Sequence, residues 1–256
     1  MEPLENAGKD PILVFEDVCA GYGKDRVLDK LSFTVDRGQV LGVIGPNGCG
    51  KTTMLNTIMG TVHLSSGIIR LYGRNISKLP TDARCRMGIG RTFQIPRPFI
   101  RMNVYENVLV SSVFGGSLSE SAAREPTLIA LRLTGMLEKA KQPAGTLTLL
   151  DRKRLEIARA IVFQPGLLLL DEVAAGLSGE EIEEVIQIVS ALRAQGFAII
   201  WIEHIIEAML RGTDRLMCIA QGRSVMIGSP QEVLCSKAVE ELYLGRKAAE
   251  EHDAEN

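Results

Sequence analysis

The sequence contains no apolar run long enough to cross a bilayer and no cysteine pair spaced for a metal. Its longest apolar stretches, GLLLL before Asp171 and FAIIWI before Glu203, are far shorter than the roughly 20 residues of a membrane-spanning helix. The 5 cysteines are scattered, without a CxxC pair, which argues against a disulfide framework or a zinc site and fits a reducing cytosol. We therefore expect any membrane role to depend on a partner.

An excess of charge of one sign is also lacking. The formal net charge is -2, so no basic field attracts nucleic acid, and the nearest approach to a basic patch is the short run Arg152 to Arg154. The first residues, MEPLENAGKDP, have neither the basic nor the apolar segment of a secretion signal. We expect no nucleic-acid partner, and we expect residues 1–9 and 247–256 to be flexible ends.

What is present is the pattern of an α/β protein. The chain has 256 residues, of which 46% are hydrophobic, enough for a sizeable core. The segments ILVFEDV and KLSFTVD predict an N-terminal antiparallel β layer, and the stretch from about 103 to 144 has helical periodicity. Elsewhere apolar strands alternate with helices, which predicts a mostly parallel sheet covered on both faces. We expect a single domain over 10–246, with a core of about 10–94 and 158–246 and a helical lobe of about 95–157.

One glycine-rich segment, GPNGCGKTT, matches the phosphate-binding pattern G-x-x-x-x-G-K-[ST] between an apolar strand and a helix. Its glycines let the backbone N–H groups point at phosphate oxygens. Lys51 supplies a positive charge for the β- and γ-phosphates, and the Thr52 hydroxyl is placed to ligate Mg²⁺. The alternative is a turn that contains Lys-Thr by chance. The match predicts a P-loop NTPase core whose nucleotide contacts are Gly45, Pro46, Asn47, Gly48, Cys49, Gly50, Lys51, Thr52 and Thr53.

Polar residues follow two other buried strands. LLLLDE ends in two carboxylates, of which Asp171 is the natural second partner for Mg²⁺ and Glu172 can polarise an attacking water. The alternative for this pair is a capping role without catalysis. His204 follows FAIIWIE at a comparable strand end, where a γ-phosphate-sensing role competes with a purely structural one. Because ligands of parallel sheets gather at the carboxyl ends of strands, we expect these residues near the P-loop.

From about Ile12 to Gly245 the ordered motifs resemble the ATPase subunits of ABC transporters. Tyr22 in AGYGKD resembles the aromatic residue that stacks on adenine. Gln94 in GRTFQIPRPF resembles the Q-loop glutamine, which contacts Mg²⁺ and the water and senses the membrane subunit, and His204 in WIEHII resembles the switch histidine. GIGRTFQIPRPF, NVYENVLV, RKRLEIARAI, DEVAAGL and ELYLG further resemble the branched-chain amino-acid uptake ATPases.

The resemblance implies a mechanism and partners. Catalysis falls to Glu172, His204, Gln94 and Lys51, the metal ligands are Thr52, Asp171 and Gln94, and the cofactors are ATP and Mg²⁺. The subunit pairs head to tail with a second ATPase, either its own copy or a sister chain, and binds membrane permease subunits on the cytoplasmic face. A solute-binding protein acts indirectly. The implied transport is import of branched-chain or other amino acids or related small polar solutes. A non-transport ABC ATPase and a slow regulatory nucleotide switch remain as alternatives.

The chain departs from this family at its signature loop, where the usual LSGGQ aligns with LTLLD. In the family this loop contacts the ATP of the other subunit. Thr148 keeps the hydroxyl, whereas Leu149 and Leu150 lose the close backbone approach of glycine, before Asp151. We hypothesise that the ATP site completed by this loop turns over more slowly. The three basic residues after it are expected in the first turn of a helix, either near a phosphate or solvated with Arg152 paired to Glu156.

Two smaller departures follow the carboxylate pair. Ser178 replaces the Asn or Asp common in the D-loop, and with Glu181 it forms an S-x-x-E capping box that predicts a helix start. This change puts the D-loop's contact across the dimer in doubt. Val173 stands where the family usually has proline after the glutamate, which we expect to change mainly the rigidity of the backbone.

Overall fold

The N-terminal part of the chain forms an antiparallel layer, as expected. The computed structural model describes residues 11–242, so the expected flexible ends, and residues 10 and 243–246 of the expected domain, lie outside it. Neighbouring strands pair antiparallel in the order β2-β1-β4-β5. Stacking of Phe15 on Phe33, with ring centroids 4.9 Å apart, joins the first two strands. The strands are β1 (Leu13–Tyr22), β2 (Asp25–Val35), β4 (Leu64–Leu71) and β5 (Arg74–Asn75).

A second sheet carries the strand ends that bear the polar residues. Its order is β10-β9-β3-β8-β7-β6, parallel throughout except for the terminal hairpin of β9 and β10. This arrangement confirms the mostly parallel sheet. The strands are β3 (Val40–Ile44), β6 (Ile89–Arg91), β7 (Leu167–Asp171), β8 (Ala198–Ile202), β9 (Arg215–Ala220) and β10 (Arg223–Gly228).

The continuous apolar character of the central strands reflects burial on both faces. Along β7, Leu168 and Leu170 enter one hydrophobic cluster, while Leu167 and Leu169 enter the other. Side chains that alternate along a strand point to opposite faces, so each strand contributes to two cores. One core packs against the antiparallel layer and the helix after the P-loop, and the other against the helices that follow residue 103.

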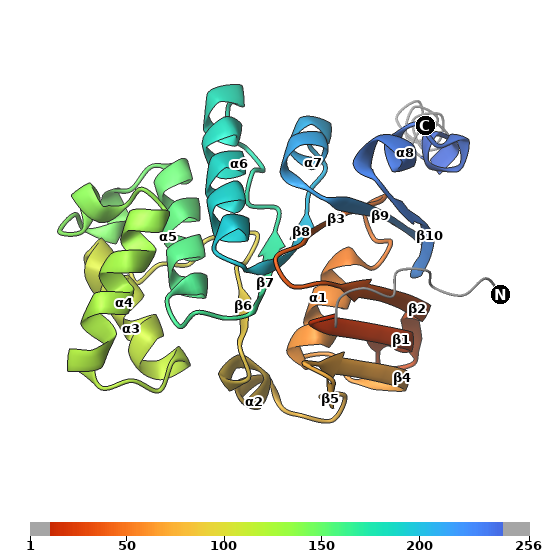
Figure 1. Ribbon diagram of the computed structural model, residues 1–256, viewed down its shortest axis with the longest axis horizontal. Coiled ribbons are helices and arrows are strands. Elements are labelled where there is room, and N and C mark those ends of the chain that lie inside the picture. The colour runs from red at the N-terminus through yellow and green to blue at the C-terminus, as the bar shows by residue number, and fades with distance from the viewer. Residues whose placement is uncertain (1–10, 243–256) are drawn as a thin grey trace, which may run out of the picture.

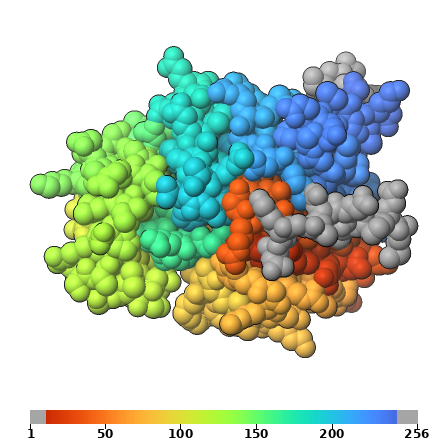
Figure 2. Space-filling view, viewed as in Figure 1, coloured from red at the N-terminus to blue at the C-terminus, as the bar shows by residue number. Residues whose placement is uncertain are grey.

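The helices cover the parallel sheet and form a lobe at one end. In Figures 1 and 2 the yellow-green lobe lies at one end of the molecule, and the red-to-orange antiparallel layer lies toward the other. The helices next to the sheets are α1 (Lys51–Met59), α2 (Thr81–Arg86), α6 (Gly179–Ala194), α7 (Ile206–Gly212) and α8 (Pro230–Leu234). The lobe contains α3 (Val104–Gly115), α4 (Glu120–Leu133), the short 3₁₀ turns Leu137–Lys139 and Ala144–Thr146, and α5 (Leu149–Ile161).

The expected lobe boundary near residue 157 falls inside α5, which is continuous from Leu149 to Ile161. We therefore propose that the core and the lobe share this helix. Among residues 11–242, no helix combines the length and the apolar character that a membrane span requires. The expected helix start after Ser178 is confirmed, because Ser178 and Glu181 form a reciprocal capping box at the beginning of α6.

The expectations for the basic run at 152–154 are corrected. Helix α5 begins at Leu149, with Thr148 as its N-cap accepting from the Asp151 N–H at 3.2 Å, so the first turn carries an acid rather than three bases. This follows the preference of the helix dipole.

The expected pairing of Arg152 with Glu156 is also wrong. The guanidinium of Arg152 donates to the carbonyls of Leu147 and Gly145, and Glu156 instead binds Arg159 at 2.7 Å. The expected exposure of Lys153 to solvent is wrong too, because Lys153 is buried. The earlier helix start accounts for the acid in the first turn, whereas the other two differences come from the contacts of Arg152 and Lys153 with backbone carbonyls.

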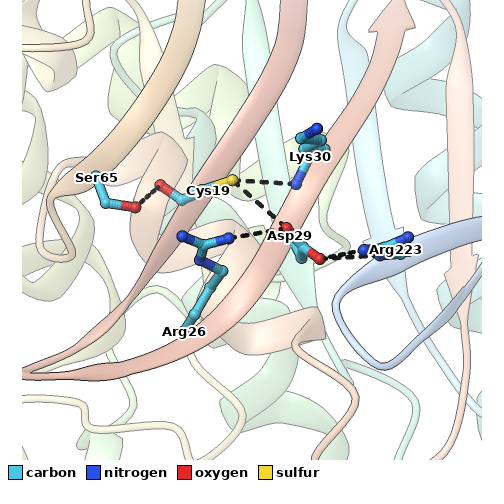
Figure 3. Close-up of polar contacts among 6 residues, drawn as sticks. All are labelled: Cys19, Arg26, Asp29, Lys30, Ser65 and Arg223. Atoms are coloured by element: carbon cyan, nitrogen blue, oxygen red, sulfur yellow. Dashed lines mark hydrogen bonds and ion pairs between the residues drawn. The ribbon is translucent and has the colours of Figure 1, made fainter.

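A polar junction between Asp29 of β2 and Arg223 of β10 ties the two sheets together (Figure 3). Asp29 on β2 accepts from Arg223 of β10 at 3.0 Å and from Arg26 at 3.3 Å, and the Arg223 hydrogen bond lowers the pKa of the Asp29 carboxyl. The backbone of Gly222 continues the junction, since its carbonyl accepts from Asp29 and its N–H donates to the Cys49 carbonyl at 2.9 Å. The turn between β9 and β10 therefore supports the loop that precedes α1.

Candidate active site

The P-loop is a tight turn between β3 and α1. Gly45 has a φ of 150°, and a Cβ there would lie 2.1 Å from the Ile219 carbonyl oxygen, so only glycine fits. Around Gly48, by contrast, a Cβ would meet nothing within 4 Å, which leaves this part of the loop open. The Lys51 ammonium donates to the carbonyls of Gly45 at 2.7 Å and of Pro46 at 3.0 Å. The lysine thus lies across the loop, where it can exchange these carbonyls for phosphate oxygens.

This loop forms one wall of an open cleft of about 630 Å³. The structure brings eleven of the expected site residues together around it, joined by Leu242 from the C-terminal part of the chain. The expected residues that line the cleft are Gly45, Pro46, Asn47, Gly48, Gly50, Lys51, Thr52, Thr53, Gln94, Glu172 and His204. Cys49 is buried and lies outside the lining, as do Tyr22, Asp171 and the residues Thr148 to Asp151.

Two expected catalytic residues meet at the mouth of the cleft. The Gln94 carboxamide donates to the Glu172 carboxylate at 2.6 Å, although 78 positions separate them in the chain. Glu172 immediately follows β7, and its φ of 50° places its backbone in the left-handed region. The His204 side chain is 62% exposed, follows β8, and has its Nδ1 3.9 Å from the Glu203 carboxylate. A carboxylate, an amide and an imidazole therefore face the phosphate loop from separate strand ends.

Asp171 lies behind this group rather than on the cleft surface. It forms a buried ion pair with Arg91, which ends β6, at 3.2 Å. Burial raises the pKa of the Asp171 carboxyl, and the attraction of Arg91 opposes this shift. Arg91 also donates to the Asn56 carboxamide at 2.7 Å, and Asn56 donates to the Tyr22 hydroxyl at 2.9 Å. A polar chain thus runs from the carboxylate to the exposed Tyr22 ring.

The expected metal ligands offer oxygen atoms of the kind that Mg²⁺ prefers. They are the Thr52 hydroxyl, the Asp171 carboxylate and the Gln94 carboxamide, with no thiol or imidazole among them. Within the described residues no group of three or more His, Cys, Asp or Glu side chains could hold a metal. The expected set is of another kind, because a hard cation also accepts hydroxyl and carboxamide oxygens and completes its shell with water and phosphate. The donor set therefore fits Mg²⁺.

The signature-loop residues lie at the start of α5, away from the cleft. Leu149 is 45% exposed, whereas Leu150 is only 7% exposed and packs in the hydrophobic core. Asp151 is buried, with its carboxylate 2.6 Å from the Lys139 ammonium. Leu149 also approaches the D-loop segment AAGLSGEE, since a Cβ on Gly176 of that segment would lie 3.4 Å from the Leu149 Cδ2. The two leucines therefore differ, because one faces the surface and the other supports the lobe.

Sequence reasoning missed four residues that support the site: Asn56, Arg91, Lys153 and Glu203. A signal existed for two of them, since Arg91 and Glu203 stand at the ends of apolar strands as Asp171 does. Asn56 lies in mid-helix on α1 and Lys153 within a basic run, so nothing local distinguished them. Their roles became evident only from the contacts.

The chain is similar to ATP-binding proteins of several transport systems. A family model described as ABC transporter matches residues 28–175. The high-affinity branched-chain amino acid transport ATP-binding protein LivG of Salmonella typhimurium is 34% identical over 250 residues, covering 92% of this chain and 98% of that protein. The lipopolysaccharide export system ATP-binding protein LptB of Escherichia coli K12 is 32% identical over 234 residues, covering 91% and 97%.

The solved structures give the same picture. The ADP conformation of an ATP-binding cassette of an ABC transporter superposes with a TM-score of 0.85 at 28% identity, covering 93% of this chain and 100% of that one. A nucleotide-free ATP-binding cassette from an ABC transporter gives a TM-score of 0.84 at 27% identity, covering 91% and 99%.

Proposed function

The chain belongs to the ABC transporter family as an ATP-hydrolysing, ATP-binding subunit, and from this premise we propose that it powers an importer of amino acids or related small polar solutes. The observation that carries the proposed site is the 2.6 Å hydrogen bond between Gln94 and Glu172 at the mouth of the P-loop cleft. It holds a carboxylate next to the place where the glycine-rich loop would present a γ-phosphate.

In the proposed mechanism each side chain has a defined task. The Glu172 carboxylate accepts a hydrogen bond from the attacking water and orients it, while Gln94 fixes the position of that carboxylate. Lys51 moves from the carbonyls of its own loop to the phosphates and stabilises their negative charge. When bound, Mg²⁺ would supply charge neutralisation at the β- and γ-phosphates, with Thr52, Asp171 and Gln94 as its protein ligands. His204 lies exposed at the rim, where it can contact the γ-phosphate.

The proposed assembly is a head-to-tail pair of ATPase subunits. Thr148 and Leu149 are exposed at the start of α5, outside this chain's own cleft, and would meet the ATP that a second subunit holds. The second subunit is either another copy of this chain or a sister chain. Tyr22, exposed at the end of β1, would stack on the adenine of this chain's own nucleotide.

A surface next to Gln94 suits a membrane permease subunit. Four large apolar side chains are exposed in the segment 93–100 around Gln94, which is unusual for a surface without a partner. The buried Asn107 accepts from the Phe99 N–H at 2.8 Å and so fixes the segment to the lobe. This surface would place the chain peripherally on the cytoplasmic face, with a solute-binding protein acting only through the permease. The exposed residues are Phe93, Ile95, Phe99 and Ile100.

Amino-acid import competes with lipopolysaccharide export, because LptB is nearly as similar as LivG. The test is to isolate the chain with its membrane partners, reconstitute the complex in proteoliposomes and measure ATP-dependent uptake of radiolabelled leucine. We expect uptake that disappears in a Lys51→Ala complex. Uptake of no amino acid, together with ATP-dependent extraction of lipopolysaccharide, would contradict the import proposal. Recovery without any integral membrane protein would favour a non-transport ATPase.

A further inference from the structure

Two buried charged side chains outside the nucleotide cleft contact the backbone around Glu172. Lys153 is only 4% exposed, and its ammonium donates to the Glu172 carbonyl oxygen at 2.8 Å. Glu203, 1% exposed, accepts from the Ala174 N–H at 2.6 Å. A buried charge is costly unless specific contacts compensate for it. Both charges are compensated in part by the same short segment, Glu172 to Ala174.

That segment requires support because of its backbone conformation. Glu172 has a φ of 50°, a left-handed conformation that residues with a Cβ rarely adopt and that persists only where surrounding contacts determine it. Its N–H donates to the Ile202 carbonyl at 3.0 Å, and its carbonyl accepts from the Ala175 N–H at 3.3 Å. The Lys153 ammonium adds a shorter bond to the same carbonyl. The peptide that follows Glu172 is therefore fixed in orientation.

Fixing this peptide restricts the backbone from which the Glu172 side chain extends. The Glu172 carboxylate accepts from Gln94 at the cleft, while the Glu172 carbonyl accepts from Lys153. Burial lowers the pKa of the Lys153 ammonium, and the nearby Glu203 and Glu172 carboxylates oppose this shift. The carboxylate is thus positioned by one contact on its side chain and one on its main chain.

Lys153 also belongs to the helix whose first turn, in the proposed assembly, would meet the second subunit. It lies on α5, five positions after the N-cap Thr148. We propose that Lys153 is a positioning residue that holds Glu172 in its catalytic orientation and links that orientation to the placement of α5. This inference rests on the proposed catalytic role of Glu172.

The test measures ATP hydrolysis, with Mg²⁺, by the complex that the full chain forms with its membrane partners and its second ATPase subunit. Lys153→Met keeps most of the volume but removes the donor, and we expect kcat to fall about 100-fold, as small misplacements of a catalytic group do. The KM for ATP and the affinity for ATP should stay unchanged, because the P-loop is not altered. Lys153→Arg, which retains a cationic donor, should restore most of the turnover. Lys153→Gln, with a shorter neutral donor, should give an intermediate kcat and serves if the methionine variant does not fold.

A matched control separates positioning from mere stability. Arg84 is another buried cation that donates to backbone carbonyls, those of Leu79, Thr57, Ile58 and Ser77, with no contact to Glu172. Arg84→Lys should lower the Tm and leave kcat unchanged. In a Glu172→Gln background, Lys153→Met should cause no further loss, because both changes act through one carboxylate.

The outcomes distinguish the two proposals. If the parent hydrolyses ATP and Glu172→Gln does not, but Lys153→Met keeps the parent kcat, the positioning role is overturned and the proposed function stands. The positioning role is also overturned if Lys153→Met lowers kcat by the same factor in the Glu172→Gln background as in the parent. It is overturned too if the loss of kcat follows the loss of Tm across the Lys153 and Arg84 variants. If the parent shows no hydrolysis, or Glu172→Gln is as active as the parent, the proposed function fails and the positioning role with it.

Discussion

The two surfaces that we propose to face nucleotide phosphates, the P-loop and the start of α5, are built in different ways. The P-loop has the full glycine pattern, and its shape is enforced by close packing, as at Gly45 against the Ile219 carbonyl. The start of α5 has leucines where glycines are usual, and one of them, Leu150, serves the hydrophobic core instead. The first surface is specialised for a ligand, whereas the second also stabilises the lobe.

This difference indicates which functions tolerate substitution. A loop that offers its own N–H groups to phosphate depends on backbone conformation, so few sequences satisfy it. A helix start offers N–H groups with almost any side chains, provided that a cap is present, and Thr148 supplies it. The α5 surface can therefore lose its glycines and still present N–H groups, at the cost of a greater distance from the ligand.

The largest expected effect concerns the P-loop. Lys51→Ala should weaken ATP binding at least about 100-fold, because it removes the charge-assisted bonds to the phosphates. Isothermal titration calorimetry with ATP and Mg²⁺ measures it, with the exposed Lys78→Ala as the control. If Lys51→Ala bound ATP as tightly as Lys78→Ala does, the P-loop would not be the surface that binds the phosphates.

Next is the carboxylate at the cleft mouth. Glu172→Gln preserves shape but removes the group that orients water, so kcat should fall by about 10²–10⁴ while ATP binding is kept. Phosphate release at saturating ATP gives kcat, and calorimetry gives the affinity. Equal activity in the two proteins would show that another group performs the chemistry.

The leucine pair separates the two roles of the start of α5, because one leucine is exposed and the other is buried. Leu150→Gly removes a buried side chain and should lower the free energy of unfolding by about 2–5 kcal/mol. Leu149→Gly acts at an exposed position and should leave stability nearly unchanged while raising ATP turnover a few-fold in the assembled complex. Denaturant unfolding and steady-state ATPase assays measure the two effects. If turnover stayed unchanged both in Leu149→Gly and in the double variant with Leu150→Gly, the proposed slow site would be contradicted.

The smallest expected effect is a change in pH dependence. Burial raises the pKa of Glu203 above its ordinary 4.5, so the folded chain binds this proton more tightly than the unfolded chain. Its contribution to stability is complete below pH 4.5 and is lost as the pH rises through the raised pKa. Glu203→Gln keeps an oxygen for the Ala174 N–H but cannot titrate. Its Tm should therefore fall less with rising pH than the parent's, whereas an exposed control, Glu180→Gln, should keep the parent slope.

Much of the fold could be predicted because its signals are local. The two strand patterns, the apolar runs and the GPNGCGKTT motif each lie within about ten residues, and the alternation of strands and helices gave the parallel sheet. The strand-end rule placed Glu172 and His204 at one cleft with the P-loop. These inferences needed no knowledge of distant contacts.

The supporting contacts could not be predicted for the opposite reason. Arg91 and Asp171 pair across 80 positions, and no periodicity marks that pairing. Lys153 and Glu203 are buried charges, which the usual preference of charged residues for the surface argues against. The start of α5 had a usable signal, since Thr148 and Asp151 have the T-x-x-D spacing of a helix N-cap, but the alignment to a loop motif concealed it.

The proposed sharing of α5 between lobe and core would have a mechanical consequence. Its 13 residues form a rod about 20 Å long, whose far end would travel about 3.5 Å for a tilt of about 10° around the core end. Rotation of the lobe would thus act on the core as a lever, with the Lys153 contact about a third of the way along the arm from Leu149. Small pushes from a neighbouring membrane protein on the lobe would reach the core through this rod without requiring any loop to refold.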